Sequence, residues 1–532
     1  MSLKVVAAGA AADAVANHVP QLVQDKVASR LFAKDYTLWG KDAEAESSIR
    51  LGWVGSAVDS APLVSAILEL REEFAALGVN RFVLCGMGGS SLAPEVITQT
   101  AGVSLVVLDS TDPDQVNDAL SGDLARTAIV VSSKSGSTVE TDSQKRTFEK
   151  AFAEAGIPVT ERVVIVTDPG SPMEAAAKAD GYRIFNADPT VGGRYSALTA
   201  FGLVPSGLAG ADIATLLAEA HEVTEALSSD DEANPGLILG AALARTASAA
   251  GYRDKVGIIA DGTKIVGLGD WAEQLIAEST GKLGLGVLPV VLQPNSAEVS
   301  AKPADMLLAR VVADAQAATD DEIVISGSLG AQFLLWEVAT AVASRLLGVN
   351  PFDQPDVESA KIAARAMLNE RAAIAAPALV DGDIEVRTNS LDLGGAASVA
   401  DAVKELLSHL DIDGYVSIHA YLDRTSVPEA AELREAFAVA TGRPVTFGWA
   451  PRFLHSTGQY HKGGPKQGVY LQLVANGEAD LAVPGRDFTF GELIASQAAG
   501  DASVLGALPR PVLTLTLGDV ASDLAKITNA LS

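Results

Sequence analysis

Two alternating patterns of hydrophobic and polar residues run along this chain. Short apolar runs, such as RFVLCG at 81–86 and TAIVVSS at 127–133, are bounded by Gly, Ser or Asp residues, as β-strands are. Longer amphipathic stretches typical of helices, such as 63–78 and 138–156, separate them. Strands that alternate with helices indicate a parallel sheet covered on both faces. The pattern therefore predicts a doubly wound α/β domain.

The same alternation divides the chain into successive units. Residues 61–235 form the first predicted α/β domain, 236–375 a second, and 376–532 a third α/β module that follows a plausible linker. Residues 1–60 are expected to form an N-terminal helical segment. Its Ala-rich start is interrupted by polar residues and is interpreted as an amphipathic helix rather than a signal peptide. A length of 532 residues agrees with roughly two to four domains.

Composition narrows the possible partners. The formal net charge is -28, and such a surface repels nucleic acid and anionic lipid, which need a basic face. No apolar run approaches the ~20 residues that span a bilayer. Cys85 is the single cysteine, which excludes an intramolecular disulfide and a Cys-based zinc cluster and favours a reducing compartment. We therefore expect a cytoplasmic protein with no membrane or nucleic-acid partner.

Two turns rich in Gly and hydroxyl residues follow strand-like runs of the first domain. They are GMGGSSLAPEV at 86–96 and SSKSGSTVET at 132–141. Ligands of open α/β sheets bind beyond the carboxyl ends of the strands, where glycines let the backbone approach an anion. Both turns could instead be ordinary helix caps, and for the first one alone that reading is preferred. Six hydroxyl residues and one lysine in ten positions exceed what a cap uses, so the second turn predicts a phosphate site.

The second turn resembles the S-K-x-x-x-T-x-E-T signature of phosphoglucose isomerases, and the pair of turns resembles the sugar-phosphate-binding SIS domain, a flavodoxin-like fold. The signature residues here are Ser133, Lys134, Thr138, Glu140 and Thr141. The resemblance implies two SIS-type domains and a phosphate held by this loop. The residues it implies around the sugar phosphate are Gly89, Ser90, Ser133, Lys134, Ser135 and Thr138.

A candidate general base lies in the segment DWAEQLIAESTGK at 270–282. Gln274 and Glu278 are four residues apart and share one helix face, and Gly281 is expected to end the helix. Glu278 then falls in the last turn, where the helix dipole disfavours negative charge by ~0.3–1 kcal/mol. This effect favours binding of a proton, as a general base requires. An arbitrary glutamate here would more often be a solvated helix end. The segment resembles the family motif E-S-N-G-K, with Thr280 in place of Asn, which implies that Glu278 is the base and Gln274 contacts substrate.

Two further motifs carry the resemblance. VGGRYS at 191–196 resembles the family's V-G-G-R-[YF]-S, whose arginine is Arg194 here; its charge would stabilise an enediolate. NPFDQPDVESAK at 350–361 resembles N-x-F-D-Q-x-G-V-E-x-x-K and supplies Gln354 and Lys361. The resemblance implies that Lys361 assists ring opening. Asp356 stands in place of the usual Gly.

The family's ring-opening histidine lies between the base and the lysine, but no histidine stands between Glu278 and Lys361 here. PRFLHSTGQYHKGGP at 451–465 offers two candidates instead. We expect His461, or less readily His455, to reach the site of the same or a neighbouring subunit, because an imidazole suits proton transfer to a ring oxygen. Two structural histidines are an equal alternative. No third ligand accompanies the pair, so a metal site is not expected.

Together the motifs, spread over about 75–375, imply isomerisation of glucose 6-phosphate to fructose 6-phosphate, a step of glycolysis and gluconeogenesis, without metal or cofactor and in a homodimer. Residues beyond 376 resemble the tail of isomerases fused behind transaldolase. The alternatives are an isomerase that also accepts mannose 6-phosphate and a non-catalytic SIS sensor of sugar phosphates. A sensor has no need for Glu278, Arg194 and Lys361 together.

Overall fold

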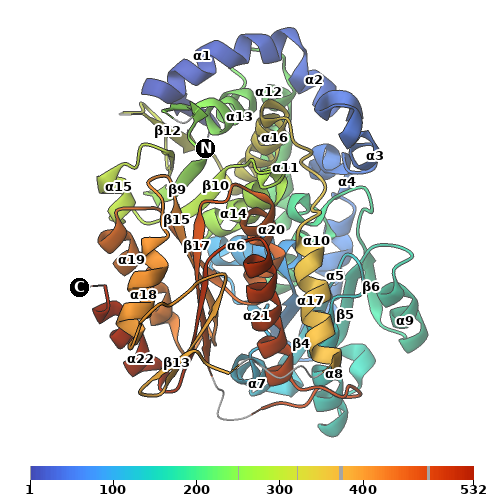
Figure 1. The fold of residues 1–532 in the computed structure, drawn as a ribbon. Helices are drawn as coiled ribbons and strands as arrows, with labels where there is room; N and C mark the ends of the chain where they lie inside the picture. The colour runs from blue at the N-terminus through green and yellow to red at the C-terminus, as the bar shows by residue number, and fades with distance from the viewer. Residues whose placement is uncertain (1, 250, 320, 371–375, 476–479, 532) are drawn as a thin grey trace.

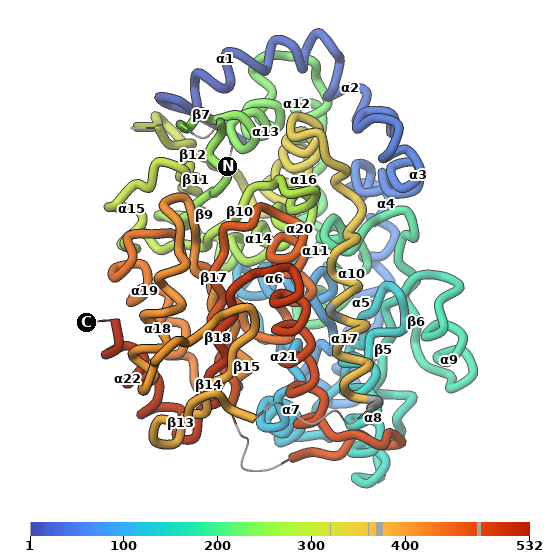
Figure 2. The backbone as a smooth tube through the Cα atoms, viewed as in Figure 1, coloured from blue at the N-terminus to red at the C-terminus, as the bar shows by residue number. Residues whose placement is uncertain are grey.

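Three large β-sheets, with helices packed around them, and one short two-stranded sheet form the framework of the molecule (Figure 1). The computed structural model describes residues 2–249, 251–319, 321–370, 376–475 and 480–531. The backbone trace shows the C-terminal residues, in orange and red, lying beside both earlier units (Figure 2). The predicted α/β class is confirmed.

The first sheet is fully parallel and has the order β3-β2-β4-β5-β6. In chain order this is the 2-1-3-4-5 arrangement of flavodoxin-like folds. Its strands are β2 (Arg81–Gly86), β3 (Val106–Leu108), β4 (Thr127–Ser132), β5 (Val163–Thr167) and β6 (Arg183–Asn186). Its helices are α5 (Leu63–Ala76), α6 (Leu92–Ala101), α7 (Pro113–Leu120), α8 (Val139–Glu154), α9 (Pro172–Asp180) and α10 (Ala200–Ala209).

Both faces of the first sheet are buried, which explains its continuous apolar runs. Along β2, Phe82 and Leu84 enter one hydrophobic cluster, whereas Val83 and Cys85 enter another on the opposite face. The side chains alternate because successive residues of a strand point to opposite faces. The run RFVLCG is thus a central strand rather than a half-exposed one.

The second sheet has the order β1-β12-β11-β9-β10. Strands β9 (Lys255–Asp261), β10 (Leu288–Leu292), β11 (Met306–Val312) and β12 (Glu322–Ser326) are parallel. Around it lie α11 (Ile213–Glu222), α12 (Thr224–Ser228), α13 (Pro235–Arg245), α14 (Leu268–Thr280), α15 (Ala297–Ala301) and α16 (Leu329–Leu347). The small sheet pairs β7 (Ala247–Ser248) with β8 (Gly251–Tyr252).

The N-terminal segment differs from the expectation of a purely helical stretch. Strand β1 (Lys4–Ala7) pairs antiparallel with β12 and extends the second sheet. The run KVVA is too short to indicate a strand by its sequence alone. It becomes a strand because it pairs with the edge of β12. The expected amphipathic helix follows as α1 (Gly9–Gln24), with α2 (Val27–Phe32), α3 (Glu44–Ser47) and α4 (Ser56–Asp59) after it.

The third sheet lies within the C-terminal module, in the order β13-β14-β18-β17-β15-β16. Strands β15 (Tyr415–Tyr421), β16 (Val445–Trp449), β17 (Gly468–Ala475) and β18 (Val512–Leu517) are parallel, and β13 (Leu379–Asp381) and β14 (Ile384–Asn389) continue the sheet antiparallel. Its helices are α18 (Val399–Ser408), α19 (Leu433–Thr441), α20 (Gly458–Gly463), α21 (Phe490–Ala507) and α22 (Val520–Asn529). The exact domain boundaries stay a prediction.

Short 3-10 helices connect these elements. They are η1 (Tyr36–Trp39), η2 (Lys41–Ala43), η3 (Gly52–Gly55), η4 (Gly88–Ser90), η5 (Leu124–Arg126), η6 (Val159–Glu161), η7 (Gly193–Tyr195), η8 (Pro428–Glu432) and η9 (Arg452–His455). Within the described ranges no single helix has the length and apolarity to cross a bilayer; η3 and α4 together with α5 meet those limits only as a pair bent by 58°.

Helix α17 (Val357–Glu370), which carries Lys361, packs against α21 of the third module (Figure 1). The approach is close, since a Cβ added to Gly500 would lie 2.8 Å from the backbone nitrogen of Ala364. No ordinary Cβ contact is that short, so Gly500 is required by the packing of the two helices.

The substitution Gly500→Val should therefore separate α17 from α21. We expect a loss of about 1–3 kcal/mol in the free energy of unfolding, the usual cost of overpacking, measured by urea denaturation. The matched control is Ala499→Val, at the partly exposed neighbouring position of α21, which carries the same β-branched side chain. Equal losses in both variants would show that helix propensity, and not the close approach, sets the cost.

Candidate active site

The two Gly- and hydroxyl-rich turns lie at the switch point of the first sheet. From β2 the chain passes to β3 on one side, while β4 pairs with β2 on the other side. The turn at η4 follows β2 and the loop 133–138 follows β4, so both stand at the carboxyl ends of neighbouring strands. Crevices at this place bind ligands in open α/β sheets.

The loop after β4 is folded by its own hydroxyl groups. The hydroxyls of Ser133 and Thr138 lie 3.0 Å apart, and the Ser133 hydroxyl accepts a bond from the backbone N–H of Gly136 at 3.1 Å. Gly136 has φ +66°, a left-handed conformation that favours glycine. Thr138 caps α8, so the free N–H groups at the start of that helix open toward the same loop. The loop thus concentrates neutral donors suited to an anion.

A cleft with a volume of about 390 Å³ opens at this switch point. It collects nearly all of the site residues expected from the sequence. Lining it are Gly89, Ser90, Ser133, Lys134, Ser135, Thr138, Arg194, Gln274, Glu278, Gln354, Lys361 and His455, together with Arg50, Met87, Ser132, Asp168, Gly192, Gly193 and Phe352. The phosphate-type loop and the carboxylate of Glu278 therefore share one cavity.

Glu278 lies in the last turn of α14, as expected, since the helix ends at Thr280. Its side chain is 13% exposed and contacts two neighbours: the guanidinium of Arg194 at 3.1 Å and the amide of Gln274 at 3.0 Å. The Gln274 amide also donates to the backbone carbonyl of His455 at 2.8 Å. The carboxylate is thus fixed in direction while it still faces the cleft.

Arg194 is 3% exposed, and its three nitrogens are fully engaged. Nε donates to the Ser279 hydroxyl at 2.9 Å, and Nη1 donates to the Gln354 side chain at 2.9 Å. Nη2 donates to the backbone carbonyls of Pro351 and Asp353. One guanidinium thus ties η7, the end of α14 and the turn before α17 together.

Two lysines near the cleft are held by acidic partners. The Lys134 ammonium lies 2.5 Å from a carboxylate oxygen of Asp168, so it points to the rim of the loop; burial lowers the pKa of Lys134 and raises that of Asp168. Lys282 bonds the Asp353 carboxylate at 2.7 Å, and burial, helped by the charge of Arg194, lowers its pKa to about 8. Lys361 is looser, since 43% of its side chain is exposed.

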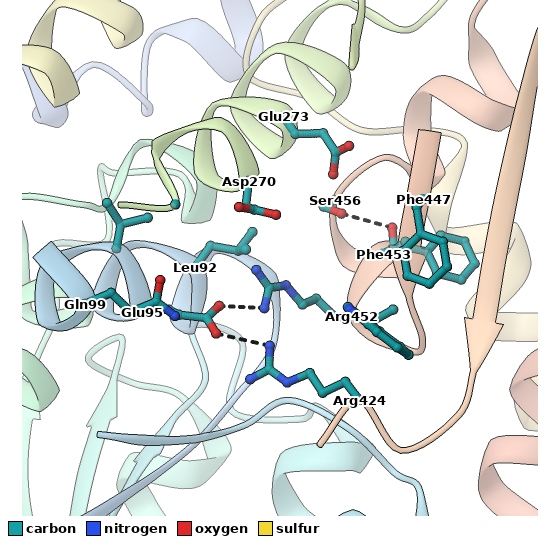
Figure 3. Close-up of a pocket in the computed structure, with 14 residues that line it drawn as sticks. Leu92, Glu95, Gln99, Asp270, Glu273, Arg424, Phe447, Arg452, Phe453 and Ser456 are labelled. Atoms are coloured by element: carbon teal, nitrogen blue, oxygen red, sulfur yellow. Dashed lines mark hydrogen bonds and ion pairs between the residues drawn. The ribbon is translucent and has the colours of Figure 1, made fainter. Parts of the chain in front are cut away.

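His455 lies in η9 and reaches the cleft from the third module. Its Nε2 is 3.0 Å from the Glu140 carboxylate. Burial alone would raise the pKa of Glu140, but the imidazole's charge and hydrogen bond hold the pKa below its ordinary value. Arg452, in the same turn, pairs with Glu95 of α6 at 2.6 Å, which fixes η9 to the first unit (Figure 3).

The expectation that His461 enters the site is wrong. His461 is 1% exposed and does not line the cleft. Its ring lies over the third sheet, where Nδ1 is 3.1 Å from the Tyr415 hydroxyl and Nε2 is 3.3 Å from the Ser417 hydroxyl. An imidazole enclosed in this way reaches a sugar neither in its own subunit nor in a neighbouring one. Burial, with His419 and Lys462 nearby, places the pKa of His461 well below its usual value.

Sequence reasoning missed three polar residues of the site. Glu140 stands in the quoted signature, so the motif could have identified it as the partner of a histidine. Arg50 and Asp168 carry no such signal. Arg50 comes from the N-terminal segment and donates to the backbone carbonyl of Pro189 at 2.9 Å, and it enters the cleft only through the fold.

Known proteins resemble this chain in sequence. Residues 73–319 match the family described as "Phosphoglucose isomerase". A probable glucose-6-phosphate isomerase of Haloarcula marismortui is 36% identical over 211 residues, or 39% of this chain and 48% of the relative. The glucose-6-phosphate isomerase of Rubrobacter xylanophilus is 29% identical over 366 residues, or 56% of this chain and 84% of the relative. Over the first relatives matched, the chain spans less than half of their length.

Solved structures show the same fold. A hypothetical protein from Thermus thermophilus superposes with a TM-score of 0.58 and 26% identity, covering 69% of this chain and 100% of that one. A glucose-6-phosphate isomerase from Chlamydia trachomatis has a TM-score of 0.51 and 18% identity, covering 66% of this chain and 79% of that one. The switch-point cleft of this α/β protein brings the hydroxyl loop and the carboxylate of Glu278 together. Over residues 73–319 the chain is similar to the phosphoglucose isomerase family.

The lowered pKa of Lys282 predicts a pH-dependent stability. The unfolded chain binds this proton up to pH ~10.5, whereas the folded protein releases it near pH 8, so stability should rise between these values. Relative to Lys282→Met, the wild type should gain at most about 1.4 kcal/mol per pH unit over that range. Urea unfolding at pH 7, 8, 9 and 10 measures the difference. The control is the exposed Lys178→Met, and a pH-independent difference for Lys282→Met would contradict the assignment.

Proposed function

We propose that this protein interconverts glucose 6-phosphate and fructose 6-phosphate by proton transfer through a cis-enediolate. One observation carries the proposal: Glu278, braced by Arg194 at 3.1 Å, lines the same cavity of about 390 Å³ as the hydroxyl loop 133–138. A base and an anion-binding loop in one cleft are what an aldose-ketose isomerase of phosphorylated sugars needs.

The phosphate would be held by hydroxyl and backbone donors. Ser133, Ser135 and Thr138 supply the hydroxyls, and the first turn of α8 supplies N–H groups. Since Asp168 neutralises the Lys134 ammonium, this lysine contributes mainly through the backbone of the loop. Gly89 and Ser90 line the cleft at the neighbouring turn and would lie along the sugar.

Ring opening requires a proton at the ring oxygen and removal of one from the anomeric hydroxyl. His455 is the imidazole in the cleft among the described residues, and its contact with Glu140 sets the direction of the ring. Lys361 lines the same cleft and would assist as a cation. Glu140 acts here as a positioning residue for His455.

The isomerisation step then belongs to Glu278. Its carboxylate takes the proton from C2 and returns it to C1, so one base serves both carbons. As the proton leaves, negative charge develops on the substrate oxygens. Arg194 already stands beside the base with its other nitrogens engaged, so it stabilises that charge without reorganisation.

Other parts of the proposal rest on the sequence. The chemistry needs neither metal nor organic cofactor, and a homodimer in the cytoplasm, acting in glycolysis and gluconeogenesis, is the setting that the resemblance implies. Activity on mannose 6-phosphate would require Glu278 to reach the proton of either epimer.

The direct test is a coupled fructose 6-phosphate assay with chelator present, on wild type and on Glu278→Gln. Because the amide cannot accept the proton, kcat should fall by about 10³-fold or more. The matched control is Glu273→Gln on the same helix, whose side chain points into a separate cavity of about 150 Å³ (Figure 3). Retained activity in Glu278→Gln would remove Glu278 as the base, and an inactive wild type would favour a sensor.

The role of His455 can be separated from that of His461. We expect His455→Ala to lower kcat on the cyclic sugar phosphate by about 10²-fold, the usual contribution of a general acid–base group. The control His409→Ala changes an exposed histidine that directly follows α18. Unimpaired turnover by His455→Ala would refute its role in ring opening.

A further inference from the structure

Gln459 is an amide buried at the meeting point of all three segments that carry the proposed chemistry. It stands in the first turn of α20, is 0% exposed and does not line the cleft. Its position in the chain follows His455 by one turn. No step of the proposed reaction uses it directly.

Its side chain bridges two other elements. Oε1 accepts a hydrogen bond from the backbone N–H of Asp356 at 2.9 Å. Nε2 donates to the Asp356 carboxylate at 2.6 Å and to the backbone carbonyl of Gly281 at 2.9 Å. Asp356 directly precedes α17, which carries Lys361, and Gly281 caps α14, whose last turn carries Glu278. One amide therefore joins the elements of base, lysine and histidine.

Backbone packing around Gln459 leaves little freedom. A Cβ on Gly281 would lie 2.5 Å from the Cα of Tyr460, and one on Gly463 would lie 2.2 Å from the Asp356 carboxylate. The backbone N–H of Gly284 donates to the carbonyl of Gly463 at 2.9 Å. Helix α20 is thus seated directly on the end of α14, with glycines at the closest approaches.

Asp356 gives this contact its particular character. The resembled motif N-x-F-D-Q-x-G-V-E-x-x-K has glycine at this position, and a glycine offers no carboxylate to a buried amide. Here the Asp356 carboxylate, which departs from the motif, accepts a hydrogen bond at 2.6 Å from the Gln459 amide of the C-terminal module. The carboxylate that departs from the motif thus has its partner in the third module.

We propose that Gln459 and Asp356 form a latch that sets the position of His455 relative to Glu278 and Lys361, with Gln459 as a positioning residue of the isomerisation. This inference rests on the proposed function and deepens it. The latch acts through geometry, since a displacement of the order of 1 Å at reacting groups costs about 10²-fold in rate. The third module thereby becomes part of the active site's framework.

The experiment compares kcat, KM and thermal unfolding for four variants in the coupled assay. Gln459→Leu, which removes all three bonds, should lower kcat about 10–100-fold with KM within about 3-fold. Asp356→Gly removes one bond and should lower kcat less, about 3–10-fold, whereas Asp356→Asn keeps an acceptor and should stay within about 3-fold of wild type. The matched control is Asp523→Leu, a buried polar side chain of α22 in the third module that accepts a hydrogen bond from the backbone N–H of Gly518 at 2.9 Å.

A double-mutant cycle measures the coupling between Gln459 and His455 in kcat, which a purely structural role of Gln459 would not produce. In the His455→Ala background, the loss caused by Gln459→Leu should shrink by about 5-fold or more, because the group it positions is gone. Full additivity overturns the proposal, as does a Gln459→Leu variant that melts earlier but keeps its kcat, or an Asp523→Leu variant with the same kcat loss. If Gln459→Leu does not fold, Asp356→Gly against Asp356→Asn makes the same comparison.

The two hypotheses fail separately. An inactive wild type sinks the proposed function and this inference with it. An active wild type whose Gln459 and Asp356 variants turn over normally sinks the latch alone.

Discussion

The buried guanidinium of Arg194 is the contact on which the geometry of the cleft depends. A charge with 3% exposure is expensive to remove from water, and it is tolerated because each nitrogen has a partner. Those partners come from the end of α14, from the side chain of Gln354 and from the carbonyls of the turn before α17. Removing any one of them would leave a buried donor unsatisfied, so the segments keep one relative position. The carboxylate of Glu278 inherits that position through its ion pair with Arg194.

Charge explains why the anion site is built from neutral groups. With a net charge of -28, the chain as a whole repels a phosphorylated sugar. Near the loop, Lys134 is paired with Asp168, and Arg50 is paired with Glu46 at 2.7 Å. Hydroxyls and helix N–H groups offset the repulsion locally, because they present positive dipole ends and need no counter-charge of their own. The other cations that line the cleft are Arg194, which is paired with Glu278, and Lys361.

The sequence was sufficient wherever the determining interactions are local. The hydroxyl loop at 132–141 and the helix end at Glu278 depend on neighbours within a few residues, and both lie where the pattern places them. The pairing of β1 with β12 could not be read from KVVA, because it depends on an edge more than three hundred residues away. The choice between His455 and His461 failed for the same reason. His455 precedes and His461 follows the same Gly-Gln pair in the sequence. Only the packing of α20 on Tyr415 and Ser417 decides which imidazole is enclosed.

The third module positions His455 through polar anchors. Arg452 pairs with Glu95 of the first unit at 2.6 Å, and Lys462 pairs with Asp501 inside the third module at 2.6 Å, the side chains of that pair being at most 1% exposed. Apolar side chains can shift past one another at little cost if the buried apolar area is unchanged. A buried charge must keep its hydrogen-bond partners, because a position without them costs several kcal/mol. Anchors of this kind add little net stability, but they fix register. In the proposed mechanism this module delivers a proton-transfer group, so it needs a fixed register more than it needs stability, because the rate depends steeply on where the imidazole stands.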